Sequence, residues 1–210
     1  MPAETAGLAT NELRMPDAGE NPLLNVMSNE STQPSFSFDN LTPTLFVDFD
    51  GTLHRGTGLL DADGSLSLDT GNPIFEFAPL LASLLGPYPK VEIVVTSSWI
   101  YKMSLEQIVS YLPQELAWRV VGSTRGYKAR FGYMQNGSAK TYIIRSYVFD
   151  YKLKHWLAID DSVYGAYHLS SDFLPLESHL VLLDSKQGIG APEAQQRIVD
   201  WLAETNKPSD

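Results

Sequence analysis

Cysteine is missing from the 210-residue sequence, and so are long hydrophobic runs. Without cysteine the chain has no disulfide, no thiolate nucleophile and no cysteine-ligated zinc or iron, which leaves oxygen and imidazole as the ligands for a metal. No apolar run reaches the roughly 18 residues that a membrane-spanning helix needs, and the N-terminus shows no basic start followed by an apolar segment. We therefore expect a cytoplasmic protein without a membrane partner.

Positive charge is also scarce, because 15 Lys and Arg residues stand against 25 Asp and Glu residues, for a net charge of -10. This balance argues against general, non-specific binding to nucleic acid, which depends mostly on phosphate neutralisation by Lys and Arg. One stretch differs: residues 116–149 contain six basic residues and no acidic one, with aromatic residues interleaved. Such a stretch is as typical of a solvated face as of a surface that binds single-stranded nucleic acid. If it binds a substrate, the candidate residues are Arg125, Lys128 and Arg130.

The chain divides into a polar start and a patterned remainder. Residues 1–40 show no sustained periodicity, which predicts a disordered leader. From Thr44, short apolar runs alternate with helical patterns, which predicts a domain over 41–207 with a three-layer, Rossmann-like α/β fold and a mainly parallel sheet. The predicted strands are 44–49, 91–95, 118–121, 155–159 and 179–183, and the predicted helices are 74–85, 104–112, 138–151 and 191–204.

Polar side chains follow three of the predicted strands. In an open parallel sheet, ligands bind outside the carboxyl ends of the strands, so these side chains should converge on one crevice. They are Asp48 and Asp50 after the first strand, Thr96 and Ser97 after the second, and Asp160 and Asp161 after the fourth.

Converging carboxylates repel one another, and burying them unpaired costs several kcal/mol each, so the arrangement needs a cation. Oxygen-only ligands with few charges favour Mg²⁺, which prefers one or two carboxylates together with waters and a substrate phosphate. The candidate metal ligands are Asp48, Asp50, Asp160 and Asp161.

The same residues suit phosphoryl transfer. Asp48 can attack phosphorus in line and form an aspartyl-phosphate. Asp50 can protonate the leaving oxygen and then take a proton from water. Thr96, backed by Ser97, can donate a hydroxyl hydrogen bond to a phosphoryl oxygen.

A phosphoryl group also needs a fixed positive partner, and Lys140 is the leading candidate. It stands in the first turn of a predicted helix, where a lysine is mildly unfavourable unless an anion is bound there. Lys152 and Lys154 are its competitors, but they directly precede a strand, which places them near the amino edge of the sheet.

The segments LFVDFDGTLH, IVVTSSW and WLAIDDS occur in this order, with a lysine between the last two. They resemble the motifs of the haloacid dehalogenase (HAD) superfamily of phosphatases and phosphotransferases. The resemblance implies these roles: Asp48 as nucleophile, Asp50 as acid and base, Thr96 and Lys140 as the phosphoryl-binding pair, and Asp160 or Asp161 as the Mg²⁺ ligand. Thr52 is similar to the phosphatase branch, and the SSW, DD and late GIG segments resemble the small HAD domain of Swiss-army-knife RNA repair proteins.

The resemblance also bears on the substrate. No large cap domain fits between the motifs, and the capless members of the family act on large substrates through an open site. We therefore expect a Mg²⁺-dependent phosphatase acting on a nucleotide or nucleic-acid end, slightly ahead of a phosphoprotein. A catalytically silent phosphate- or nucleic-acid-binding regulatory module and a phosphotransferase are the alternatives. Residues 61–72 are expected to form a flexible flap beside the site, and core or surface roles are expected for His54, His155, His168 and His179.

Overall fold

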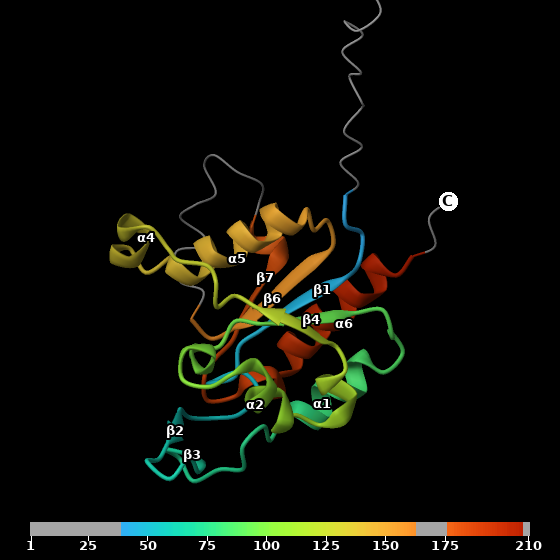
Figure 1. The fold of residues 1–210 in the computed structure, drawn as a ribbon. Helices are drawn as coiled ribbons and strands as arrows, with labels where there is room; N and C mark the ends of the chain where they lie inside the picture. Colours follow the sequence, from blue (N-terminus) through green and yellow to red (C-terminus); the bar gives the residue numbers. More distant parts are fainter. Residues whose placement is uncertain (1–38, 163–175, 208–210) are drawn as a thin grey trace, which may run out of the picture. The chain divides into compact units, whose positions relative to one another are not determined.

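A parallel five-stranded sheet forms the centre of the computed structural model, which describes residues 39–162 and 176–207 (Figure 1). The sheet has the order β5-β4-β1-β6-β7, which confirms the predicted α/β fold. The predicted leader falls almost wholly outside the described residues. The strands are β1 (Thr44–Val47), β4 (Glu92–Val95), β5 (Val120–Ser123), β6 (Trp156–Asp160) and β7 (Leu180–Leu182).

Helices cover both faces of this sheet, as Figure 1 shows for α5 on one side and α1, α2 and α6 on the other. Within the described residues, no helix combines the length and apolar character needed to cross a lipid bilayer. The α-helices are α1 (Ala78–Leu85), α2 (Leu105–Ser110), α3 (Gln114–Ala117), α4 (Phe131–Gln135), α5 (Ala139–Tyr151) and α6 (Pro192–Thr205). The 3₁₀ helices are η1 (Ser98–Tyr101), η3 (Leu176–His179) and η4 (Gly188–Gly190).

The alternation of side chains along the strands divides the core into two layers. Leu45 and Val47 point into the larger cluster, which contains the buried faces of α1 and α6. Phe46, between them, points into a second cluster with Ile144 and Tyr147 of α5. Because both faces are covered, the central strands β1, β4 and β6 are apolar except at one end position each, which explains the hydrophobic runs in the sequence.

The chain order places a topological switch point at β1. From β1 the chain continues to β4 and β5 on one side, whereas β6 and β7 lie on the other side of β1. In such sheets the adjoining connections leave in opposite directions, which opens a crevice at the carboxyl end of the strand. The residues that follow β1 therefore lie at the mouth of this crevice.

A short antiparallel hairpin lies between β1 and α1, where a flexible flap was expected. Its strands β2 (Gly58–Leu60) and β3 (Leu66–Leu68) pair with each other and with no strand of the main sheet. The residues from 48 to 77 contain no other regular element, so no large cap domain interrupts the fold there.

Several predicted boundaries are shifted by one to four residues, and two of these shifts have local reasons. The helix predicted over 74–85 begins only at Ala78, because Phe75 has a φ of 58°, which no helix accommodates. The strand predicted over 118–121 begins at Val120, because Trp118 ends α3 as its C-cap.

Candidate active site

Three strands bring polar side chains to one level at the carboxyl edge of the sheet. Val47 of β1 pairs in register with Val95 of β4 on one side and with Ile159 of β6 on the other. The next residues along these strands are Asp48, Thr96 and Asp160. All three side chains are buried, so the apolar strands hold them in fixed positions at the switch point.

Lys140 lies between two of these side chains. Its Nζ is 2.7 Å from Asp48 Oδ2 and 2.6 Å from Asp160 Oδ2, although 92 residues separate Lys140 from Asp48. The competing lysines lie elsewhere: Lys152 is the C-cap of α5, and Lys154 pairs with Asp39 at 3.3 Å. Of the three lysines considered, the structure brings only Lys140 to the predicted nucleophile.

The negative charge of this cluster is only partly balanced. Asp48, Asp160 and Asp161 each offer a carboxylate oxygen within 4.8 Å of the others. Burial and the charge of Asp160 raise the pKa of Asp48 to about 7, although Lys140 opposes the shift. Burial also raises the pKa of Asp161, again with the charge of Asp160 contributing. Three crowded carboxylates against a single ammonium group favour a further cation.

The donors of this cluster fit a hard divalent cation. All of them are carboxylate oxygens, which suit Mg²⁺ and offer nothing to soft metals. Oδ1 of Asp160 accepts from the backbone N–H and the hydroxyl of Ser162, whereas the buried Oδ2 forms an ion pair with Lys140 but has no hydrogen bond within the described residues, which leaves it available to a cation. The aspartate cluster can therefore hold a metal ion.

Two threonines supply hydroxyl groups that lack a partner within the described part of the chain. Thr96 is 5% exposed and Thr52 is fully buried, and neither Oγ1 has a hydrogen bond there. A buried hydroxyl left without a partner costs about 1–3 kcal/mol. The hydroxyl of Thr96, at the carboxyl edge beside Asp48, can therefore donate a hydrogen bond to a ligand. Ser97, predicted to assist Thr96, accepts from the backbone N–H of Trp99 and caps η1.

Asp50 lies beside the aspartate cluster and is not one of the three carboxylates that meet there. Burial alone would raise its pKa, but hydrogen bonds from His54, the backbone of Gly58 and Trp99 outweigh burial, so that the pKa is lowered. Gly51, directly after it, has a φ of 66°, and a Cβ at this position would overlap with the carboxylate of Asp161. Glycine therefore allows the turn and the close approach of Asp161.

A hollow of about 560 Å³ opens next to Asp50 and Asp161. The base of the β2–β3 hairpin forms one wall, and the segment after β7 forms another. The lining of this hollow includes residues that the sequence analysis did not single out: Arg55, Thr57, Thr70, Asn72, Ser185 and Lys186. Two of them could have been found from the sequence. Ser185 and Lys186 follow the fifth predicted strand, and residues that follow a parallel strand lie at the carboxyl edge of the sheet.

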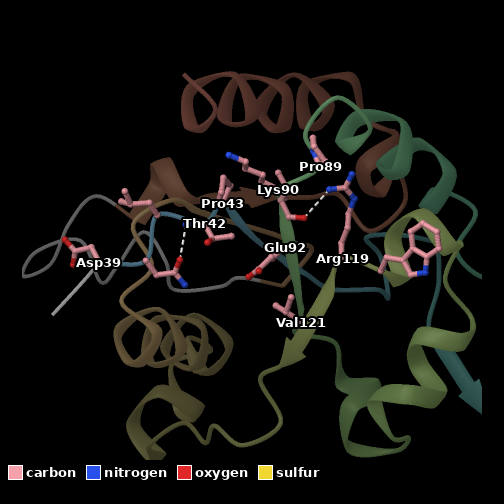
Figure 2. Close-up of a pocket in the computed structure, with 12 residues that line it drawn as sticks. Asp39, Thr42, Pro43, Pro89, Lys90, Glu92, Arg119 and Val121 are labelled. Atoms are coloured by element: carbon pink, nitrogen blue, oxygen red, sulfur yellow. Dashed lines mark hydrogen bonds between the residues drawn. The ribbon is translucent and has the colours of Figure 1, made fainter. Parts of the chain in front are cut away.

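The basic stretch between residues 116 and 149 divides into separate groups. Arg125, Lys128 and Arg130 are exposed on the segment between β5 and α4, which leaves the sheet at its carboxyl edge. Arg119 precedes β5 and lines a hollow at the amino edge, as Figure 2 shows. Its guanidinium group donates to the carbonyls of Leu85, Tyr88, Val91 and Glu115. Arg119 therefore ties α1, β4 and α3 together and lies away from the aspartates.

This arrangement predicts a structural role for Arg119. The change Arg119→Met keeps the length of the side chain but leaves several carbonyls without their donor, so we expect a loss of about 2 kcal/mol in the free energy of unfolding. Urea denaturation measures the loss. Turnover per folded molecule should stay unchanged, and a fall in turnover without a loss of stability would contradict this role.

Comparison with known proteins identifies a family. The family model described as "HAD domain in Swiss Army Knife RNA repair proteins" matches residues 44–194, which is more than half of the chain. The matched range begins with β1 and includes all residues of the aspartate cluster. The search of the curated proteins and the search of the solved structures gave no match.

Proposed function

The chain belongs to the family of HAD domains in Swiss Army Knife RNA repair proteins, and on this premise we propose that it is a Mg²⁺-dependent phosphohydrolase. The observation that carries the proposal is the contact of Lys140 with both Asp48 and Asp160 at the switch point of the sheet. A buried carboxylate, a lysine and the hydroxyl of Thr96, which has no hydrogen bond within the described residues, are the groups that attack, neutralise and orient a phosphoryl group.

In the proposed reaction, a carboxylate oxygen of Asp48 attacks phosphorus while the bond from phosphorus to the leaving oxygen breaks. Asp50 gives its proton to that oxygen. Asp50 then takes a proton from water, the water oxygen attacks phosphorus, and the bond between Asp48 and phosphorus breaks. One water is consumed, inorganic phosphate leaves, and both carboxyl groups return to their initial state.

The protonation state of Asp50 changes during this cycle. In the free protein its hydrogen bonds lower the pKa despite burial, so the carboxylate is ionised. A bound phosphoryl group places negative charge beside it, and a like charge raises the pKa of a carboxyl group. Binding of the substrate thus favours the proton on Asp50 that the leaving oxygen needs.

The metal residues in this proposal are Asp48, Asp160 and Asp161. A bound Mg²⁺ would balance their charge and polarise the phosphoryl group. Lys140 keeps the pair of Asp48 and Asp160 together, and burial of the pair excludes water from the attacking oxygen.

Metal binding should depend on pH, because the raised pKa of Asp48, about 7, means that a proton occupies this ligand in more acidic solution. A proton and a cation compete for the carboxylate, so we expect Mg²⁺ to bind roughly tenfold more weakly at pH 6 than at pH 8. Titration calorimetry at both values measures the difference. Asp48→Asn should remove most of the dependence, and an affinity independent of pH in the unchanged protein would contradict this assignment.

We propose a nucleic-acid or nucleotide phosphate as substrate. The site has no cap domain within residues 48–77 and 124–155, which leaves it open to a large molecule. Arg125, Lys128 and Arg130 are exposed on a segment that leaves the same edge of the sheet. Such cations suit the backbone of a single strand.

The experiment that tests the function is a phosphatase screen with Mg²⁺. It compares p-nitrophenyl phosphate, nucleotides, oligonucleotides with 3′- or 5′-phosphates and phosphopeptides. We expect release of phosphate, fastest from the oligonucleotides or nucleotides, and its loss with EDTA. Activity that ignores EDTA would contradict the role of the metal, and a preference for phosphopeptides would contradict the substrate class.

A further inference from the structure

Asp50 has one carboxylate oxygen held by three donors. Its Oδ1 accepts from the indole Nε1–H of Trp99 at 2.9 Å and from the backbone N–H of Gly58 at 3.0 Å, and His54 Nε2 lies 3.1 Å from the same atom. The three donors come from β2, η1 and the turn after β1. Within the described part of the chain, all these contacts fall on Oδ1, which fixes the plane of the carboxyl group and leaves Oδ2 for other chemistry.

His54 is itself held in the tautomer that donates to Asp50. The backbone N–H of Phe75 donates to its Nδ1 at 3.4 Å. Nδ1 is therefore an acceptor, and the ring hydrogen lies on Nε2, which faces Asp50. The imidazole is fully buried, and its ring centroid lies 5.5 Å from those of Phe75 and of Trp99.

The backbone at Phe75 is strained where it donates to His54. Its φ of 58° lies in the left-handed region, where a bulky residue is a genuine outlier. The phenyl ring is 4% exposed and contacts Phe49 edge to face, so packing holds the conformation. A strained backbone of this kind persists only where the surrounding contacts hold it in place, and such residues are found mostly at functional sites.

Gly58 makes room for the indole. A Cβ at this position would overlap with the five-membered and six-membered rings of Trp99, including Nε1. The absence of a side chain at Gly58 therefore allows both its own N–H and the indole N–H to reach the same oxygen of Asp50. The hairpin begins at this residue, so the contact also joins the hairpin to the catalytic carboxylate.

We propose that Trp99 and His54, with the backbone N–H of Gly58, are positioning groups that orient Asp50 for proton transfer through Oδ2 to the leaving oxygen. The inference rests on the proposed phosphohydrolase function and adds the groups that make Asp50 effective. Asp50 lines the hollow beside the hairpin, so the leaving group of the substrate lies on this side of the site.

The test is the dependence of the rate on the leaving group. An alkyl phosphate such as glycerol 2-phosphate needs a proton on its leaving oxygen, whereas p-nitrophenyl phosphate releases a stable phenolate. In Trp99→Phe an aromatic side chain remains but the indole and its N–H are lost, so we expect kcat/KM to fall roughly tenfold for the alkyl phosphate. For p-nitrophenyl phosphate it should change by less than about twofold, because general acid catalysis contributes little there. The ratio kcat/KM reports formation of the aspartyl-phosphate, before Asp50 acts as a base.

Two further variants complete the test. Gly58→Ala should displace the indole and reproduce the selective loss, which decides the question if Trp99→Phe does not fold. Trp118→Phe is the matched control, because this tryptophan is 78% exposed and distant from Asp50 in the fold. An equal loss for both substrates, or none for the alkyl phosphate, would overturn the positioning role. If the unchanged protein hydrolyses only oligonucleotides or nucleotides, their terminal phosphate replaces glycerol 2-phosphate as the alkyl phosphate. If it releases phosphate from no substrate of the screen with Mg²⁺, the proposed function fails and this inference fails with it.

Discussion

Asp48→Asn should lower kcat by about 10⁴-fold or more, because an amide cannot form the acyl-phosphate through which the reaction is proposed to run. The fold should survive, since the amide is of the same size and its oxygen can still accept the hydrogen bond that Lys140 donates to Asp48 at 2.7 Å. Burial raises the pKa of Asp48, which means that the folded protein disfavours the charge, so a neutral amide should leave the thermal midpoint equal or higher.

Single-turnover assays with p-nitrophenyl phosphate and thermal melts measure both effects. Asp39→Asn is the matched control, because Asp39 is half-exposed and pairs with Lys154 at the amino edge of the sheet. It should retain full activity. A variant of Asp48 that still turns over at a tenth of the original rate would contradict its role as nucleophile.

Lys140→Met should cause the second large effect. The change removes the ammonium group between Asp48 and Asp160, whose side chains are 6% and 1% exposed, and leaves their charges uncompensated. Removing one partner of a buried ion pair costs about 3 kcal/mol or more, and the loss of the phosphoryl partner should lower kcat by about 10²–10³-fold. Urea denaturation and steady-state kinetics measure the two losses.

The loss of stability in Lys140→Met should increase with pH. A carboxyl group whose folded pKa is raised stabilises the protein at low pH, and this contribution disappears as the pH rises through the folded value. For Asp48 that value is about 7 with Lys140 present and must rise further without it. The destabilisation by Lys140→Met should therefore be greater at pH 8 than at pH 6.

Addition of Mg²⁺ shows whether Lys140→Met is destabilised by uncompensated negative charge or by a loss of packing. A divalent cation can replace part of the missing positive charge, so Mg²⁺ should raise the thermal midpoint of Lys140→Met by more than that of the unchanged protein. Lys154→Met is the matched control, since its exposed pair with Asp39 is worth at most about 1 kcal/mol. Equal destabilisation by the two lysine variants would contradict the account.

The sheet and the strand ends were predictable from the sequence because both depend on short-range patterns. Buried parallel strands form nearly continuous apolar runs, and the sequences around Phe46, Val94 and Ala158 have this character. The convergence of Asp48, Thr96 and Asp160 follows once the strands are taken as parallel neighbours. The position of Lys140 followed from its place at the start of a helix leading into β6.

The parts that were not predicted depend on long-range packing. His54 shows no metal-ligand spacing, and its contact with Asp50 depends on the buried position of Trp99 and on the unusual backbone of Phe75. Arg119 stands in a basic stretch, but its carbonyl partners lie up to 34 residues away in the sequence. The role of Ser97 could not be decided from the sequence, because a serine that follows a strand can bind a ligand or cap the next turn. In the structure Ser97 caps η1.

The most direct test of the central claim is to trap the phosphorylated enzyme. The protein is mixed with substrate and Mg²⁺, quenched in acid within one turnover, digested and analysed by peptide mass spectrometry. We expect one added phosphoryl group on Asp48, removable by hydroxylamine as for an acyl-phosphate. Turnover of substrate without this intermediate, or with the phosphoryl group on another residue, would contradict the account.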